Sequence, residues 1–97
     1  MKNKQIAETI IRQMGGPGKL KAMVNARNFA CNEKGDLTFK FSGSRKYNLV
    51  KVELTPLDDY TIKFYKNTTE KKIIEGIYND QLKEIFEEET GLRLSLF

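Results

Sequence analysis

The chain has 97 residues and a formal net charge of +4, with 39% hydrophobic and 31% charged residues. This length corresponds to one modest core, and we expect residues 1–97 to form a single domain. The composition is typical of a soluble globular protein, and no apolar run approaches the roughly 20 residues of a membrane-spanning helix.

The first predicted element is a helix over residues 5–14, where apolar side chains recur on one stripe. Gly15 stands where a left-handed C-terminal cap is wanted, and Pro17 prevents the helix from continuing. The loop after it ends in Gly18-Lys19, as a phosphate-binding loop does. However, this loop follows a helix and lacks the first glycine and the final Ser or Thr of that motif. We therefore interpret it as a helix-ending turn.

The middle of the chain predicts antiparallel hairpins. Residues 19–26 fit either one helical turn or the beginning of a strand. Three segments then alternate apolar and polar residues, which is typical of half-buried strands: 37–41, 50–54 and 60–65. Short turns rich in Gly, Ser, Asn, Asp and Pro join them. Within residues 70–77 we expect a further strand, with a short helix as the alternative.

A second helix is expected to begin after a cap at Asn79 or Asp80 and to end at Thr90, before Gly91. The alternating leucines of the tail are expected to pack onto the domain: Leu92, Leu94 and Leu96. The predicted fold class is α+β. An antiparallel β-meander of four to five strands would be packed on one face by an N-terminal and a C-terminal helix.

The sequence offers few groups for catalysis. It contains no histidine, the commonest general base and metal ligand. Its single cysteine, Cys31, borders a predicted turn, and we expect a small buried or half-buried side chain there. Asp58 and Asp59 are expected to serve a proline-containing turn. We therefore expect no catalytic residues, no bound metal, no cofactor and no enzymatic activity.

The charge is unevenly spread along the chain. Residues 1–50 hold ten Lys and Arg against three Asp and Glu (+7), whereas residues 51–97 hold seven against ten (−3). This polarity favours an anionic partner. The candidate residues for binding nucleic acid or an acidic partner are Lys19, Lys21, Arg27, Lys40, Arg45, Lys46, Lys51, Lys63 and Tyr65. The candidate residues for binding a basic partner lie on the last predicted helix: Glu84, Glu87, Glu88 and Glu89.

Lys40, Lys51 and Lys63 would share the solvent face of the sheet, together with Glu53 and Tyr65, if the strand period holds. Sheets that carry lysines and aromatic rings bind single strands of nucleic acid, and Phe29 is a further candidate for base stacking. The alternative is an ordinary solvated face, because lysine on an exposed strand also prevents aggregation.

Several landmarks along the chain occur in the order of one known family. They are Ile10, Ile11, Gln13, Gly15 and Gly16, Ala26-Arg27-Asn28-Phe29, Leu37, Phe39 and Phe41, Val52-Glu53-Leu54, Asp59-Tyr60, Gly76-Ile77-Tyr78-Asn79-Asp80-Gln81-Leu82, Phe86 and Thr90-Gly91-Leu92. By these residues the chain resembles a family of small accessory proteins of tailed phages and prophages. The resemblance implies a protein that occupies a host or defence protein stoichiometrically, as some phage proteins occupy CRISPR effectors, or one that binds nucleic acid. It implies no catalytic residue.

The leading hypothesis is a non-enzymatic phage-type inhibitor or adaptor that binds a host protein or nucleoprotein complex, such as a CRISPR defence complex. The alternative is a nucleic-acid-binding accessory protein that uses the lysine-lined face. A self-associating assembly component is a third hypothesis, and the oligomeric state stays open. The N-terminus is unlike a secretory signal and the lone cysteine suits a reducing compartment, so we expect a cytoplasmic location in the host, away from membranes.

Overall fold

The computed structural model describes residues 2–33 and 35–92, which form five strands and three α-helices. Two helices come first: α1 (Lys2–Gln13) and α2 (Pro17–Val24). The strands follow: β1 (Arg27–Cys31), β2 (Leu37–Lys40), β3 (Leu49–Leu54), β4 (Tyr60–Lys66) and β5 (Thr69–Ile77). One turn of 3₁₀ helix, η1 (Asn79–Gln81), leads into the last helix, α3 (Leu82–Thr90).

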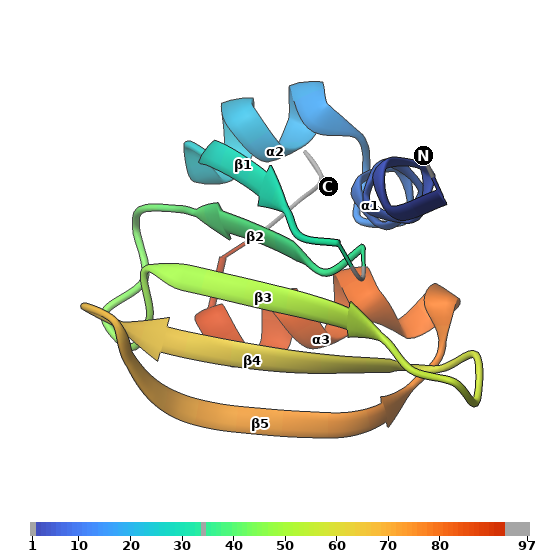
Figure 1. Cartoon of the computed structure of the whole chain (residues 1–97). Helices are drawn as coiled ribbons and strands as arrows, with labels where there is room; N and C mark the ends of the chain where they lie inside the picture. Colours follow the sequence, from blue (N-terminus) through green and yellow to red (C-terminus); the bar gives the residue numbers. More distant parts are fainter. Residues whose placement is uncertain (1, 34, 93–97) are drawn as a thin grey trace.

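The strands form one antiparallel sheet in the order β1-β2-β3-β4-β5, so that neighbours in sequence are neighbours in space (Figure 1). Leu37, Val52 and Ile62 stand in one row across β2, β3 and β4. Because successive side chains of a strand point to opposite faces, this register gathers the apolar residues on one face. The meander of five strands with helices at both ends confirms the predicted α+β fold.

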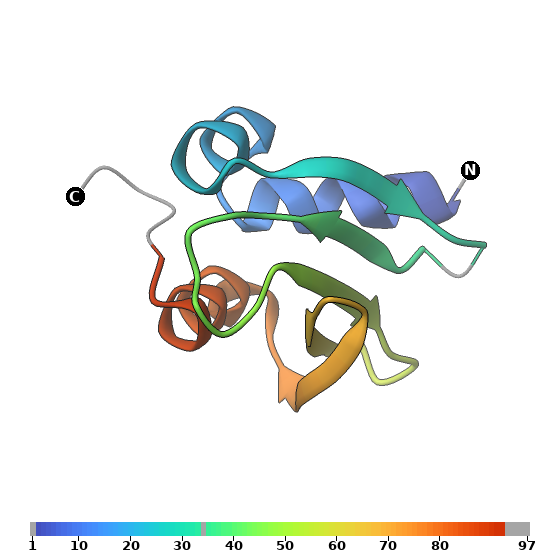
Figure 2. The ribbon, with the colours of Figure 1, turned by 90° about the vertical axis from the view of Figure 1, so that its left-hand side faces the viewer.

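The core forms where the helices cover that face. Helix α3 lies behind β3 and β4 in Figure 1 and to one side of the strands in Figure 2. Its Phe86 is fully buried among three phenylalanine rings of the sheet, at centroid distances of 5.0–6.3 Å: Phe39, Phe41 and Phe64. Helices α1 and α2 complete the core with buried aliphatic side chains: Ile10, Met14, Leu20 and Val24.

The two segments that the sequence leaves open have distinct structures. Residues 19–24 belong to helix α2, which has Pro17 in its first turn and buries Leu20 and Val24. Asn25 ends this helix in the left-handed conformation, with φ 55°. Residues 70–77 belong to strand β5, which pairs with β4 along its length.

The last helix begins differently from the prediction. Asn79 and Asp80 lie inside the 3₁₀ turn η1, and α3 itself starts at Leu82. Gln81 Oε1 accepts a hydrogen bond from the backbone N–H of Tyr78 at 3.0 Å, which satisfies a donor at the start of the turn. At the other end Gly91 closes α3 in the left-handed conformation, with φ 75°.

Cys31 is exposed, contrary to the expected buried or half-buried side chain, because it lies at the end of the edge strand β1. Asp59 serves the turn as predicted, since its backbone oxygen accepts the N–H of Thr55 at 2.9 Å. Leu92 packs against the core. Leu94 and Leu96 lie outside the described residues.

Candidate functional site

The face of the sheet opposite the helices, here called the outer face, carries the lysines that the alternating pattern assigns to it. Lys51 of β3 lies directly opposite Lys63 of β4. The next row on this face contains Lys40 of β2, Leu49 of β3 and Tyr65 of β4. The structure therefore brings these lysines and Tyr65 to one face.

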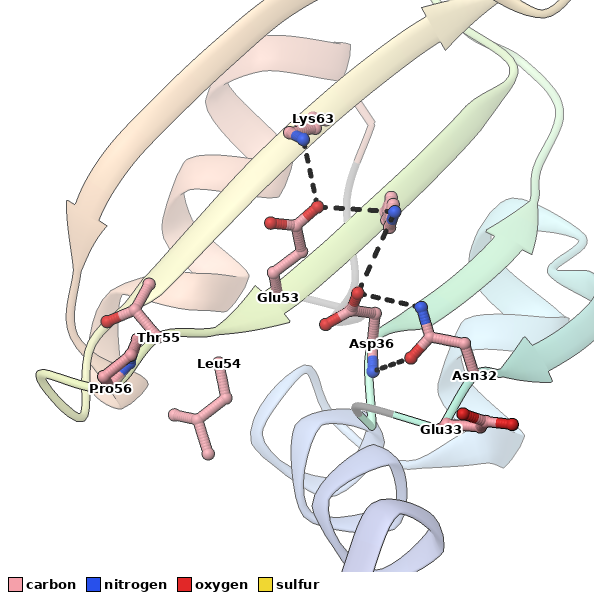
Figure 3. A pocket seen from close by; sticks show the side chains of 9 residues that line it. Asn32, Glu33, Asp36, Glu53, Leu54, Thr55, Pro56 and Lys63 are labelled. Carbon is pink, nitrogen blue, oxygen red and sulfur yellow. Dashed lines mark hydrogen bonds and ion pairs between the residues drawn. The ribbon is translucent and has the colours of Figure 1, made fainter.

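Carboxylates engage two of these lysines (Figure 3). Glu53 Oε2 lies 3.1 Å from Lys63 Nζ and 3.4 Å from Lys51 Nζ. Lys51 Nζ also lies 3.8 Å from Asp36 Oδ2. We call Asp36, Lys51, Glu53 and Lys63 the ion-pair network. Its two positive and two negative charges cancel, so the middle of the outer face has no net positive charge.

Asp36 anchors the network to the β1–β2 turn. It is 7% exposed, its Oδ2 accepts a hydrogen bond from Asn32 Nδ2 at 2.9 Å, and its backbone N–H donates to Asn32 Oδ1 at 3.1 Å. The acceptor that faces Lys51 is thus fixed by the fold. An open hollow of about 980 Å³ lies over the network and is also lined by Glu33, Leu54, Thr55 and Pro56.

The ion-pair network shifts the pKa values of Glu53 and Lys63. Partial burial alone would raise the pKa of Glu53, but the hydrogen bond and charge of Lys63, together with Lys51, outweigh burial and lower it. The hydrogen bond and the charge of Glu53 raise the pKa of Lys63. A lowered carboxyl pKa stabilises the fold above the unfolded-state pKa, and this stability is lost as pH falls through the folded value. A raised lysine pKa stabilises below its unfolded-state value and loses this effect as pH rises through the folded value.

We expect Glu53→Gln to lower the free energy of unfolding at pH 7 by about 1 kcal/mol, the upper range for pairs near the surface. Glu53 pairs with two lysines whose side chains are 27–29% exposed, so solvent screens the pairs only in part. The loss should shrink as the solution is acidified toward pH 3, because the native carboxyl group takes up a proton as pH falls through its lowered pKa. Urea denaturation at pH 7 and at pH 3 measures this loss of stability. The control is Glu75→Gln, which changes an exposed glutamate of β5. An equal loss at pH 7 and pH 3 would show that charge is not its origin.

Four cations gather at the opposite end of the strands from Asp36 and Glu53. Arg27 starts β1 opposite Lys40, which ends β2, and Arg45 and Lys46 lie in the following loop. All four are exposed, and within the described part of the chain none forms an ion pair. We call Arg27, Lys40, Arg45 and Lys46 the basic end. The turns at the other end carry acidic residues, so charge is polarised along the strands: Glu33, Asp36, Asp58 and Asp59.

Two other predicted basic residues, Lys19 and Lys21, and the candidate stacking ring of Phe29 belong to other parts of the fold than the basic end. Lys19 and Lys21 are exposed on α2, which packs on the helix-covered face of the sheet. Phe29 packs its ring against Phe39 of the core, at a centroid distance of 5.2 Å. Tyr65 is half-buried on the outer face.

The acidic set lies on α3, on the far side of the sheet from the outer face (Figure 1). Glu84 and Glu88 are exposed, whereas Glu87 and Glu89 are half-buried. Burial, followed by the charge and hydrogen bond of Glu89, raises the pKa of Tyr47. One member of the acidic set, Glu89, therefore lies beside Tyr47 of the β2–β3 loop.

The chain finds no match among models of protein families, curated proteins or solved structures. Within residues 2–33 and 35–92, no group of three His, Cys, Asp or Glu side chains is placed to hold a metal ion. None of the helices in the same part of the chain has the length and apolar content needed to cross a bilayer.

Proposed function

We propose that the protein acts by binding, as an inhibitor or adaptor that occupies a host protein or nucleoprotein complex, with the basic end as its contact. The basic end carries this proposal because its four cations have no carboxylate partner among the described residues, whereas the lysines of the ion-pair network are neutralised. Arg27 and Lys40 lie directly opposite each other, and like charges so placed destabilise a sheet. An anionic partner would relieve that repulsion.

The resemblance to small phage proteins supports a defence complex of the CRISPR type, or another host nucleoprotein, as the partner. Such complexes expose phosphates beside protein surface, and a compact group of cations suits a local anionic feature. A nucleic-acid strand laid across the whole outer face would have to compete with Glu53 for Lys51 and Lys63.

Direct binding of free nucleic acid is the second candidate function. Tyr65 favours it, because this half-buried ring stands in the same row as Lys40 on the outer face. Aromatic rings beside cations are the usual platform for stacking single-stranded bases.

The double substitution Arg45→Glu and Lys46→Glu is expected to weaken capture of nucleoprotein complexes from bacterial cells by about tenfold or more, since it reverses two contact charges. Quantitative pull-down with the purified protein measures this. Lys71→Glu with Lys72→Glu, on exposed positions of β5, makes the same change of charge elsewhere. Equal capture by both variants would contradict the proposal.

Fluorescence anisotropy with labelled single-stranded and double-stranded DNA and RNA separates the candidates. Salt-sensitive binding of naked nucleic acid at physiological salt supports the second function. Capture of the complex without such binding supports the first. Concentration-dependent growth in size without either would indicate the self-associating component.

A further inference from the structure

A second hollow opens on the outer face between the basic end and the β4–β5 turn. Its volume is about 340 Å³, and its lining residues are Arg27, Lys40, Asn48, Leu49, Asn67 and Thr68. Two of these side chains are cations, three carry hydrogen-bonding groups, and none is a carboxylate. We call it the Arg27–Lys40 hollow.

The guanidinium of Arg27 is held in place at one wall. Its Nη1 donates to the backbone oxygen of Asn25 at 3.1 Å and to Ser42 Oγ at 2.9 Å. Its Nη2 and Nε donors have no partner among the described residues, and neither has the ammonium group of Lys40. The wall therefore presents the held guanidinium of Arg27 beside the ammonium group of Lys40, and none of the six lining residues is a carboxylate.

The β4–β5 turn forms the other wall in an unfavourable backbone conformation. Asn67 has φ 51° and Thr68 has φ 73°, the combination of a two-residue hairpin turn in which glycine is preferred at the second position. A β-branched residue in the left-handed region is an outlier, and such strain concentrates at ligand sites. The Thr68 hydroxyl makes no hydrogen bond within the described chain. Thr68 thus places a hydroxyl group at a position where glycine would make the turn more stable.

Two asparagines join the walls. Asn48 Nδ2 donates to Asn67 Oδ1 at 3.0 Å, and the backbone N–H of Asn67 donates to Asn48 Oδ1 at 3.1 Å. This pair ties the β2–β3 loop to the β4–β5 turn and leaves Asn67 Nδ2 without a partner among the described residues. Donors that have no partner among the described residues therefore lie on both walls of this hollow.

We propose that the Arg27–Lys40 hollow binds a phosphate group, with both cations on its oxygens and hydrogen bonds from Asn67 and Thr68. Phosphate matches two cations in charge, and its oxygens suit the forked donors of arginine. A phosphodiester of a nucleic-acid strand and free phosphate offer the same chemistry. The inference rests on the proposed function, since it names the group on the nucleoprotein that the basic end contacts.

Two probes test the proposal on the full chain by NMR titration: single-stranded oligothymidylate and inorganic phosphate. Both are expected to shift the Arg27 side-chain N–H and the backbone amides of Asn67 and Thr68. Arg27→Gln with Lys40→Gln should weaken oligothymidylate binding by about tenfold or more, because charge-assisted hydrogen bonds are lost. The control, Lys19→Gln with Lys21→Gln on α2, removes the same charge and should change binding by less than about twofold.

The substitution Thr68→Gly distinguishes a direct loss of binding from a loss of binding caused by a destabilised fold. It should raise the melting temperature by relieving the strained turn and should still weaken the binding of both probes. Binding unchanged in Thr68→Gly and in the double Gln variant would overturn the proposal, as would shifts confined to other parts of the protein. Phosphate shifts without oligothymidylate binding would support the hollow and identify free phosphate as its ligand.

The two proposals fail separately. If the Arg45 and Lys46 reversal abolishes nucleoprotein capture while neither probe shifts the hollow, the phosphate site is wrong and the proposed function stands. If phosphate binds in the hollow and no complex is captured, the phosphate site stands and the proposed function is wrong.

Discussion

Phe86→Ala is expected to lower the free energy of unfolding by about 3–5 kcal/mol, as truncation of a buried phenylalanine usually does. Phe86 is fully buried and links α3 to three phenylalanine rings of the sheet, so alanine leaves a cavity where helix and sheet meet. A domain of this size is stable by only about 5–15 kcal/mol. Calorimetry should show the melting temperature falling by more than about 12 °C.

Leu57→Ala is the control for this substitution. Leu57 is 83% exposed in the β3–β4 turn, and its truncation should change stability by less than about 0.5 kcal/mol. If the Phe86→Ala protein had the same melting temperature as the wild type, α3 would not pack on the sheet through this ring.

Glu53→Lys is expected to raise the affinity for single-stranded nucleic acid by about tenfold at low salt and to steepen its salt dependence. The substitution removes the carboxylate that engages Lys51 and Lys63 and adds a cation beside them. The middle of the outer face then changes from neutral to positive. Anisotropy titrations at several salt concentrations give both quantities, and each added phosphate contact should contribute about 0.7 to the slope.

Glu75→Lys makes the same change of charge at an exposed position of β5. If it raises the affinity equally, the gain comes from overall charge and not from release of the lysines. If neither variant gains affinity, Lys51 and Lys63 do not face the nucleic acid, and the basic end alone makes the contact.

The sequence predicts strands well where one face is buried and the other is wet. In β2 and β3 the buried side chains alternate, and in β4 Tyr60, Ile62 and Phe64 do so while Thr61 between them is buried as well. Strand β5 is an edge with mostly exposed side chains, so its letters alternate weakly and a helix remained an alternative. Helix α2 spans eight residues, too few for a clear period. Its helical state depends on burying Leu20 and Val24 in the core.

The candidate site was only partly predictable for a related reason. Strand period placed Lys51, Lys63 and Glu53 on one face, but their pairing needs the register between β3 and β4. Asp36 reaches the network through a turn whose shape depends on Asn32. The second hollow needs the β2–β3 loop and the β4–β5 turn to meet through Asn48 and Asn67. No local pattern reports contacts between residues this far apart in the chain.

Exposure of Cys31 has a practical consequence. It is the only cysteine of the chain and lies at the far end of β1 from Arg27, four residue steps or about 13 Å along an extended strand. A maleimide dye therefore attaches to the natural sequence at one position, close enough to Arg27 to sense an arriving ligand by quenching and far enough to leave that residue uncovered. The wild-type chain thus carries its own attachment point for single-molecule and stopped-flow fluorescence.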